Sequence, residues 1–194
     1  GPSSSEVKIL KKMISEGMSV ARLNLSHGTI DEHKKYVSNA REAAHELSVP
    51  IGILIDIPGP KYRVDKIPGG SIDLKKGQKI IIGSETDLNE KVIKLNVWPD
   101  GISKEVGKSK QIFLDDGLIK LSIDSKRGKN IYCTVLNNSN LKSNKSVTIP
   151  GSVNKLDYFT NETKNGLNFA KKVNATFVGL SFIRNSDDIK KVKK

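Results

Sequence analysis

The outer parts of the chain alternate between helical and strand-like patterns of hydrophobic positions. Residues 5–17 place Val, Ile, Leu and Met on one stripe and end in glycine, which predicts an amphipathic helix. Residues 20–26 alternate apolar and polar side chains, as a strand with two different faces does. A second helix is predicted from Thr29, which stands before Glu32 in the spacing of a capping box, to about Leu47.

The next apolar run, residues 50–56, is nearly continuous and ends in Asp56. Such a run is typical of a strand that is buried on both faces of a parallel sheet. Near the end of the chain the pattern predicts a helix over 161–172, a strand over 175–182 and a short helix from Asp187. Short strands separated by helices indicate βαβ units with right-handed crossovers, so these parts predict an α/β domain.

The middle of the chain has a different pattern. Short β-branched runs alternate with Gly, Asn and Asp turns, and no helical period is present. The predicted strands are 79–82, 91–95, 111–114, 119–123 and 130–135. This pattern indicates a small all-β unit inserted into the α/β chain. The expected domains are 1–61 and 149–194 for the α/β part and 62–148 for the insertion.

The composition is that of a globular protein. The chain has 194 residues, of which 36% are hydrophobic and 28% charged. No apolar run approaches the roughly 18 residues of a membrane span, and no signal segment is evident, so no membrane partner is expected. Cys133 is the only cysteine, which excludes an internal disulfide and suits a reducing cytoplasm. It is expected to pack inside a strand, with a reactive thiol as the alternative.

The formal net charge of +12 raises nucleic acid as a partner. The lysines are scattered, however, and aromatic residues make up only 5% of the chain. Base stacking needs aromatic side chains on one platform, whereas Trp98, Phe113 and Tyr132 are dispersed along the sequence. We therefore expect a solvated basic surface that favours small anionic molecules. A nucleic-acid-binding β-barrel is the less favoured alternative.

The strand over 20–26 carries polar side chains where a buried strand would be apolar. Its two faces are Ala21, Leu23 and Leu25 on one side and Arg22, Asn24 and Ser26 on the other, followed by His27 and Gly28. A polar face that ends in Ser-His-Gly suggests a site at the C-terminal end of the strand. An edge strand with a solvated face is the alternative.

The next strand also ends in charged residues. Asp56 is followed by a Pro-Gly-Pro turn at 58–60 and then by Lys61 and Arg63. Active sites of barrels occupy the C-terminal face, and Arg can hold phosphate oxygens bidentately. The turn can also serve as a rigid domain junction, and both interpretations can hold together.

Five short segments resemble the motifs of pyruvate kinases in the order of that family. Residues 20–28 match its strand motif almost residue for residue, and 56–63 resemble its junction between strand and lid. Residues 113–119 resemble its Asp-Asp-Gly lid segment, 145–151 its return to the barrel, and 181–184 the end of its fourth strand. Each match is weak alone, but together they cover the chain in register and are specific.

The resemblance implies a partial (β/α)8 TIM barrel with a small β-barrel lid inserted after the third strand. It implies a glycolytic enzyme that transfers a phosphoryl group between phosphoenolpyruvate and ADP, giving pyruvate and ATP, with Mg2+ and usually K+. By this resemblance Arg22 binds the substrate phosphate. The monovalent-cation site is formed by Asn24, Ser26, Asp56 and the carbonyl of Ile57, and the nucleotide contacts are Asn24, Leu25, Ser26, His27, Arg63 and Lys145.

Five positions depart from the family pattern. Ile57 and Pro58 stand where the family often has Thr-Lys, and Lys61 stands where most K+-dependent members have Glu. An ammonium at this position can supply the charge that K+ supplies elsewhere, so the hypothesis is that the enzyme works without K+. The alternative is that Lys61 is only a hinge residue. Thr163 and Gly166 replace acidic residues of the family, and a weaker helix start is expected there.

The resemblance also concerns the length of the chain. In the family the catalytic Lys and the acidic Mg2+ ligands lie beyond the position of Lys194. The expectation is an inactive fragment of a cytoplasmic, tetrameric enzyme, with open strand edges. A pyruvate-kinase-like binding or regulatory protein without catalysis is the alternative.

Overall fold

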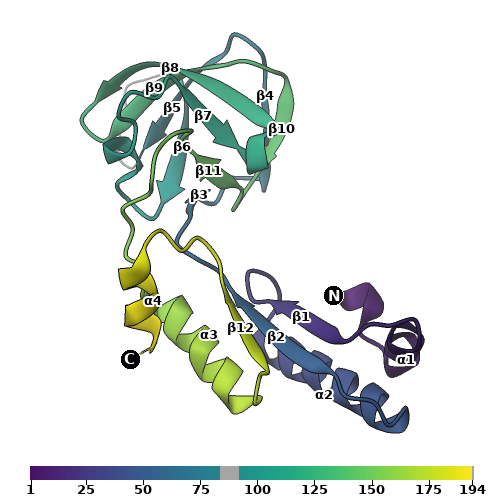
Figure 1. The fold of residues 1–194 in the computed structure, drawn as a ribbon. Coiled ribbons are helices and arrows are strands. Elements are labelled where there is room, and N and C mark those ends of the chain that lie inside the picture. The colour runs from purple at the N-terminus through teal and green to yellow at the C-terminus, as the bar shows by residue number, and fades with distance from the viewer. Residues whose placement is uncertain (84–91, 194) are drawn as a thin grey trace. The chain divides into compact units, whose positions relative to one another are not determined.

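A computed structural model describes residues 1–83 and 92–193, which form two compact units (Figure 1). We call them the α/β unit, Gly1–Pro60 with Asp157–Lys194, and the β unit, Lys61–Leu156. Each unit has its own cluster of buried apolar side chains. The two are therefore described separately.

The α/β unit is a parallel sheet with helices packed against it (Figure 1). Its elements are η1 (Pro2–Ser4), α1 (Val7–Ser15), β1 (Val20–Asn24), α2 (Ile30–Glu46), β2 (Gly52–Ile57), α3 (Asn161–Lys172), β12 (Phe177–Leu180) and α4 (Ser186–Lys193). Within the described part of the chain the strand order is β1-β2-β12, so β2 is central and β1 is an edge strand. Asn24 and Gly179 are both register partners of Asp56.

The core of the α/β unit lies against the central strand. Ile53, Ile55 and Ile57 are at most 1% exposed. Ala40 and Ala43 of α2 belong to the same cluster, and their small side chains let the helix approach the sheet closely. Side chains of a strand alternate between its faces, so these isoleucines confirm burial on one face, whereas Leu54 on the other face is only partly buried. That the three strands are part of an eight-stranded barrel stays a prediction.

The local signals placed most helices well. The side chain of Thr29 accepts a hydrogen bond from the backbone N–H of Glu32, and the reciprocal bond is also present, so the predicted capping box is confirmed. The helix predicted over 161–172 has those limits. The strand predicted over 20–26 ends at Asn24, because the side-chain oxygen of Asn24 accepts from the backbone N–H of Ser26 and turns the chain. The strand predicted over 175–182 is shorter, Phe177–Leu180.

The β unit is a closed barrel of seven strands in its described residues, in the order β11-β3-β6-β5-β9-β8-β7, with β4 and β10 paired beside it. The strands are β3 (Tyr62–Val64), β4 (Ser71–Leu74), β5 (Lys79–Gly83), β6 (Ile93–Trp98), β7 (Gln111–Leu114), β8 (Ile119–Arg127), β9 (Asn130–Val135), β10 (Ser139–Lys142) and β11 (Ser146–Thr148). Two short helical turns, η2 (Ile102–Lys104) and η3 (Asp115–Gly117), complete it. Closure pairs the strand edges that an open sheet would expose.

The sequence predicted five strands of the β unit and missed four short ones. The limits of β7 and β9 are as predicted. The strand predicted over 91–95 starts at Lys91, which lies outside the described residues, and β6 begins at Ile93. β3, β4, β10 and β11 were not predicted, because they have three or four residues each and lack the run of consecutive apolar side chains that marks β7.

A buried carboxylate ties the two ends of the β unit together. Glu105 is 7% exposed and accepts hydrogen bonds from the hydroxyls of Tyr62 (3.3 Å) and Ser152 (2.9 Å) and from the backbone N–H of Lys155 (3.0 Å). Tyr62 lies where the chain enters the unit, and the other two lie where it leaves. The unit thus continues to Leu156, whereas the predicted insertion ended at 148.

Cys133 lies in the core of the β unit and is 1% exposed. Burial raises the pKa of its thiol to about 12, so little thiolate forms near neutral pH. The environment is that of a packing residue and not of a reactive thiol.

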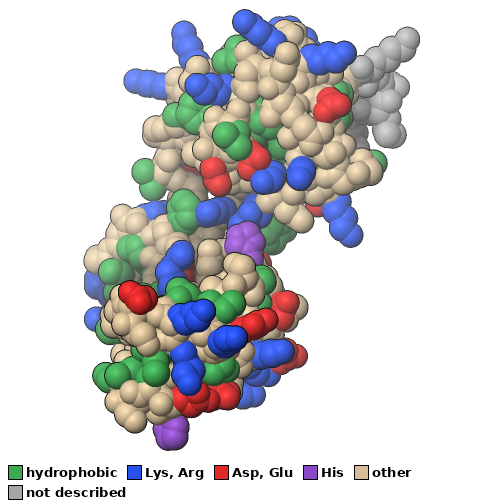
Figure 2. Space-filling model, turned by 90° about the vertical axis from the view of Figure 1, so that its right-hand side faces the viewer, with side chains coloured by type: hydrophobic (Ala, Val, Ile, Leu, Met, Phe, Trp, Pro, Cys, Tyr) green, Lys and Arg blue, Asp and Glu red, His purple; other side chains and the backbone are tan. Residues whose placement is uncertain are grey.

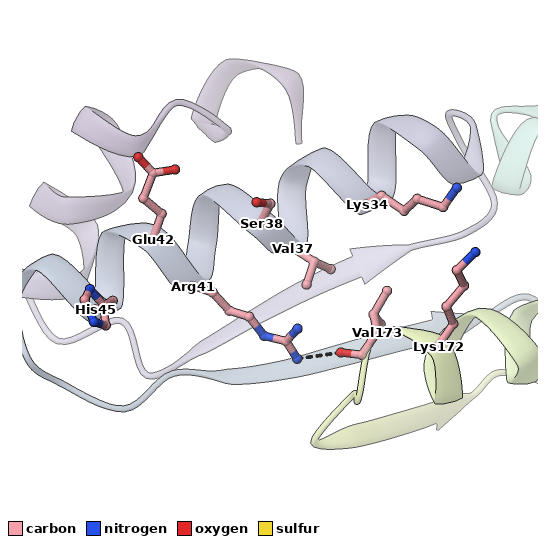
Figure 3. A pocket seen from close by; sticks show the side chains of 8 residues that line it. All are labelled: Lys34, Val37, Ser38, Arg41, Glu42, His45, Lys172 and Val173. Atoms are coloured by element: carbon pink, nitrogen blue, oxygen red, sulfur yellow. Dashed lines mark hydrogen bonds between the residues drawn. The ribbon is translucent and has the colours of Figure 1, made fainter.

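The α2 and α3 helices are linked by a side chain on α2. The guanidinium of Arg41 donates to the backbone carbonyls of Val173 and Asn174 (3.0 Å for Asn174), just after α3 ends (Figure 3). A guanidinium at this point satisfies carbonyls that the helix leaves unpaired. The groove of ≈ 560 Å³ around it is lined mainly by α2, from Lys34 to His45, and by Lys172 and Val173.

Basic side chains are spread over the surface of both units. On the face shown in Figure 2, Lys and Arg side chains are scattered, with Asp and Glu side chains among them. This agrees with a solvated basic surface and offers no continuous basic stripe on that face. In the described residues, no helix is long and apolar enough to cross a membrane.

Substitution of Tyr62 by Phe is predicted to reduce the decline of the free energy of unfolding with rising alkaline pH. Burial, and then the charge of Glu105, raise the pKa of the Tyr62 phenol above its usual value of about 10. Above that pH the unfolded chain loses a proton that the folded chain keeps, so the free energy of unfolding falls as pH rises. Chemical denaturation between about pH 8 and 11 should show a smaller decline in Tyr62→Phe than in the parent.

The same variant should lose about 1 kcal/mol at pH 8 through the missing hydrogen bond. Tyr132→Phe is the matched control in the same barrel. Parallel curves for the parent and Tyr62→Phe would contradict the prediction.

Candidate functional site

The polar residues predicted at two strand ends lie on neighbouring strands. β1 carries Arg22 and Asn24, and β2 carries Asp56 and Ile57. Asn24 and Asp56 are register partners, so they lie side by side at the C-terminal ends of the two strands. β1 is an edge strand with a partly exposed polar face, so the alternative of an edge strand also describes it. The two descriptions are compatible.

Asp56 is the centre of the contacts at this edge. Its carboxylate is largely buried, at 9% exposure for the residue. One carboxylate oxygen accepts from Nε (3.1 Å) and Nη2 of Arg22, and the other accepts from the hydroxyl of Ser181 (3.0 Å). Each carboxylate oxygen thus has a partner, which a buried charge requires.

Arg22 is held at one side and open at the other. Its side chain is 61% exposed although it is paired with Asp56. A guanidinium has five N–H donors, of which two are engaged here. The remaining donors can bind an anion in the planar, bidentate manner that suits phosphate and carboxylate groups. The ion pair therefore orients a cationic group for an anionic ligand.

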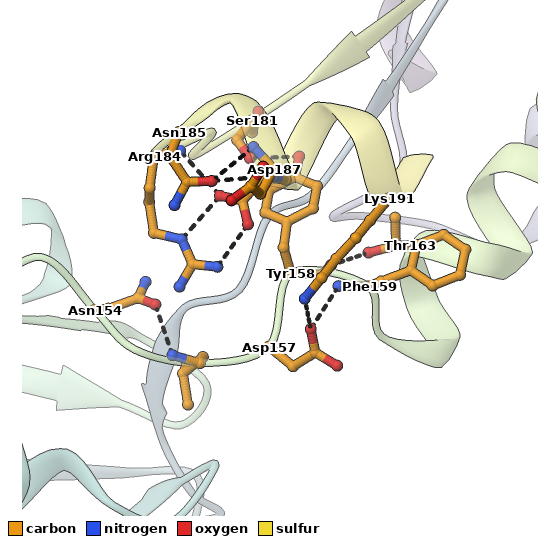
Figure 4. Close-up of polar contacts among 12 residues, drawn as sticks. Asn154, Asp157, Tyr158, Phe159, Thr163, Ser181, Arg184, Asn185, Asp187 and Lys191 are labelled. Atoms are coloured by element: carbon orange, nitrogen blue, oxygen red, sulfur yellow. Dashed lines mark hydrogen bonds and ion pairs between the residues drawn. The ribbon is translucent and has the colours of Figure 1, made fainter. Parts of the chain in front are cut away.

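A second set of contacts fixes the end of β12 (Figure 4). Tyr158 is fully buried, and its hydroxyl donates to the carbonyl of Ser181 (3.0 Å). The hydroxyl of Thr163 donates to the carbonyl of Tyr158 (2.9 Å), which joins the first turn of α3 to this contact. Burial raises the pKa of Tyr158, so the phenol stays a donor. Contacts thus run from α3 through Tyr158 and Ser181 to Asp56.

The same region gives Thr163 and Gly166 a structural role. Thr160 is the N-cap of α3, and its side chain accepts from the backbone N–H of Thr163 (3.2 Å). A Cβ on Gly166 would lie 3.1 Å from carbon atoms of the Ile57 side chain. The absence of a side chain at 166 therefore lets α3 pack on the end of β2. The helix start, expected to be weak, is capped.

An ion pair closes the turn after β12. Arg184 donates from Nε and Nη2 to the two carboxylate oxygens of Asp188 (3.0 Å each), and Asp188 is 3% exposed (Figure 4). These hydrogen bonds lower the pKa of Asp188. The arrangement is bidentate and fixes the geometry of the segment that follows Ser181.

Gly59 of the Pro-Gly-Pro turn touches the end of β12. A Cβ on Gly59 would lie 2.1 Å from the carbonyl oxygen of Ser181, a distance that no side chain can occupy. The chain after β2 and the chain after β12 approach each other only because residue 59 has no side chain. This supports the interpretation of the turn as a rigid segment.

The loop after β1 is a compact turn. The side-chain oxygen of Asn24 accepts from Ser26 N–H (2.9 Å), and the carbonyl of Asn24 accepts from His27 N–H (3.4 Å). Gly28 has φ +74°, in the left-handed region that favours glycine. The backbone N–H of Leu25 donates to the carbonyl of Asp56 (3.0 Å), so a hydrogen bond to β2 holds the start of the turn.

Two predicted nucleotide contacts belong to the β unit. Arg63 lies on β3 and donates from Nη1 to the carbonyl of Asn144 (2.9 Å). Lys145 precedes β11 and pairs with Asp115 (2.9 Å). Arg63 and Ser146 are register partners on these two strands, so the cationic residues are neighbours within this unit.

The oxygens expected at a monovalent-cation site have suitable chemistry. Asn24, Ser26, Asp56 and the carbonyl of Ile57 supply hard oxygen donors, which alkali and alkaline-earth ions prefer. Several of these atoms also accept protein hydrogen bonds, including the Ile57 carbonyl, which accepts from Ser181 N–H (3.2 Å). The single negative charge is balanced by Arg22. Across the described ranges, no three His, Cys, Asp or Glu side chains are grouped as metal ligands.

Sequence reasoning missed two residues that support this site. The sequence motif of residues 181–184 contains Ser181 but assigns it no role, and no sequence motif contains Tyr158. A hydroxyl at the end of a predicted strand is the signal that could have pointed to Ser181. No local pattern marks Tyr158, because its contact with Ser181 joins residues far apart in the chain.

Comparison with known proteins places the whole chain in one group. The family model described as the barrel domain of pyruvate kinase matches residues 1–194. A pyruvate kinase of Thermococcus litoralis is 37% identical over 193 residues, which cover 100% of this chain and 40% of the relative. Pyruvate kinases of Trypanoplasma borreli (34%, 39% of the relative) and Bacillus licheniformis (35%, 33% of the relative) also match along 100% of this chain. The chain thus spans between 33% and 40% of the length of these relatives.

Substitution of Gly59 by Ala is predicted to destabilise the α/β unit by about 3 kcal/mol, as overpacking against backbone does. The added methyl group would force the carbonyl of Ser181 away from its position. The hydroxyl of Ser181, which donates to the Asp56 carboxylate, would move with it. Gly179→Ala is the control, since its Cβ would meet neighbours at ordinary distances of 3.5–3.7 Å. Urea denaturation measures both variants, and equal stability of the two would contradict the prediction.

Proposed function

Since the chain belongs to the pyruvate kinase family, we propose that it provides the phosphate-recognition part of an enzyme that transfers a phosphoryl group between phosphoenolpyruvate and ADP. Its relatives are named pyruvate kinases and are longer than this chain. Phosphoryl transfer demands mainly positioning and neutralisation of charge. We propose that the strand ends of the α/β unit perform these tasks.

The pairing of Arg22 with Asp56 carries this proposal. Arg22 is oriented by the carboxylate of Asp56 and keeps donors open to solvent. We propose that these donors bind the phosphate of phosphoenolpyruvate. Ser181 in turn holds Asp56 in place. The guanidinium is therefore already ordered before the ligand binds, and binding costs it little conformational entropy. Asp56 and Ser181 act through Arg22 and do not themselves contact the phosphate.

The turn after β1 is proposed to contact the nucleotide. Asn24, Leu25, Ser26 and His27 offer backbone and polar groups in a fixed turn. Lys145, now paired with Asp115, and Arg63 can exchange such contacts for phosphate oxygens. A multiply charged anion competes well for these side chains because it carries more charge than one carboxylate.

Two cations enter the proposal in different ways. Mg2+ would neutralise charge on the nucleotide phosphates, and we propose that its protein ligands are not among the described residues. A monovalent cation would be held by Asn24, Ser26, Asp56 and the carbonyl of Ile57, and it would add positive charge near the transferred group. We propose that the ammonium of Lys61 supplies this charge instead.

The 194-residue chain is proposed to bind substrate without turning it over. The grouping of acidic side chains that would hold a divalent ion is missing from the part of the chain that the structure describes. The buried thiol of Cys133 suits a reducing compartment, which supports a cytoplasmic site of action.

Substitution of Arg22 by Lys is predicted to weaken the binding of phosphoenolpyruvate on the order of tenfold. Lysine keeps the charge but loses the planar pair of donors, and it cannot bridge Asp56 and the ligand in the same way. Titration calorimetry with the chain measures the affinity, with Arg127→Lys in the β unit as the control. Undiminished affinity in Arg22→Lys would remove the main support for the proposal.

An enzyme that contains this chain is predicted to form pyruvate in K+-free buffer at a rate within about twofold of that with K+, because Lys61 provides the charge. Lys61→Glu should make activity dependent on K+, whereas the control Lys66→Glu should not. An enzyme that is silent without K+ and revived by it would show that Lys61 does not replace the ion.

A further inference from the structure

His33 is a buried polar residue that the proposed mechanism does not use. It lies near the start of α2 and is 5% exposed. Its ring packs edge-on against Tyr36 (centroids 5.9 Å apart) and at a tilt against Phe169 (6.3 Å). An apolar side chain would fill such a position without the cost of burying ring nitrogens. The imidazole is therefore explained by what its nitrogens bind.

One ring nitrogen binds the turn after β1. Nε2 lies 2.7 Å from the backbone carbonyl oxygen of His27. A carbonyl oxygen can only accept, so Nε2 carries the proton and donates. The other nitrogen, Nδ1, is buried and has no hydrogen-bond partner in the described part of the chain. The ring is thus a single-purpose donor, fixed as one tautomer by its contact with the turn.

The contact falls in the middle of a segment that is fixed at both ends. At its start, the side-chain oxygen and the carbonyl of Asn24 accept hydrogen bonds from the backbone N–H groups of Ser26 and His27, respectively. At its end, the backbone N–H of Thr29 donates to the Glu32 carboxylate (2.6 Å) in the capping box. The carbonyl of His27 lies between these anchors. Among the residues that the structure describes, His33 is the hydrogen-bond donor to this carbonyl.

Space around Gly28 shows how closely the turn approaches α2. A Cβ on Gly28 would lie 3.1 Å from a carboxylate oxygen of Glu32 and 3.6 Å from Nε2 of His33. The turn therefore rests directly on these two side chains of the first helical turns. The position of the turn is therefore set by its contacts with α2 as well as by β1.

We propose that His33 is a positioning residue for nucleotide binding, which rests on the proposed function. By donating Nε2–H to the carbonyl of His27, it holds the turn of residues 24–28 in the conformation that contacts the nucleotide. His33 itself contacts neither substrate. Phosphoenolpyruvate, bound by Arg22 on the preceding strand, does not depend on this contact.

Two substitutions separate positioning from packing. His33→Gln places an amide N–H where Nε2 stands, whereas His33→Phe keeps an aromatic ring between Tyr36 and Phe169 but removes the donor. Calorimetric titrations of the chain with ADP and with phosphoenolpyruvate give the two affinities, and urea denaturation gives the stability. Two readouts need no nucleotide: the tautomer of His33 by long-range 15N–1H spectroscopy, and the exchange rates of the Ser26 and His27 amides.

The expected result is a loss of ADP affinity of about fivefold in His33→Phe, the effect of one hydrogen bond, and a change within about twofold in His33→Gln. Phosphoenolpyruvate affinity should be unchanged in both. Amide exchange in the turn should accelerate in His33→Phe alone, and the parent spectrum should show Nε2 as the protonated nitrogen.

Three outcomes would overturn the proposal. Unchanged ADP affinity in His33→Phe would show that the turn needs no such donor, and equal losses in the two variants would show that His33 acts through packing. If the parent chain does not bind ADP, the nucleotide role fails together with that part of the proposed function. In that case the exchange rates still show whether His33 holds the turn, so the two failures can be told apart.

Discussion

The arrangement of the α/β unit depends on one buried carboxylate. Asp56 ends the central strand of a parallel sheet, where a carboxylate without partners would cost several kcal/mol. Arg22 on β1 and Ser181 after β12 satisfy it, so that one side chain fixes three strand ends in relation to each other. The same requirement leaves a guanidinium oriented at the surface. A structural need of the sheet is met by the same contact that orients the guanidinium for the proposed anion site.

The support behind this contact comes from residues that are distant in sequence. Tyr158 and Gly59 determine where the carbonyl of Ser181 lies, one by donating to it and the other by leaving room for it. His33 of α2 holds the turn that follows β1 through its hydrogen bond to the carbonyl of His27. Buried hydrogen bonds of this kind restrict the conformations of the groups they hold, and such restriction is what recognition of a small anion requires.

The extent to which the sequence predicted this structure follows from the range of the interactions. Hydrophobic period and capping are local, so the helix of 161–172, the capping box at Thr29 and the buried central strand could be predicted. The short strands β3, β4, β10 and β11 could not, because their pairing decides their conformation. Arg22 and Asp56 could be placed at neighbouring strand ends from the pattern alone. Their mutual contact and its support by Ser181 needed the register between strands.

In the proposed function, Asp56 acts on phosphate recognition through Arg22. A double-mutant cycle with Arg22→Lys, Asp56→Asn and the combined variant, read out as affinity for phosphoenolpyruvate, tests it directly. If Asp56 only orients Arg22, removing the carboxylate after Arg22 has been replaced should cost little more, and the effects should be strongly non-additive. Additive losses would show that the two residues act independently and would contradict the claim.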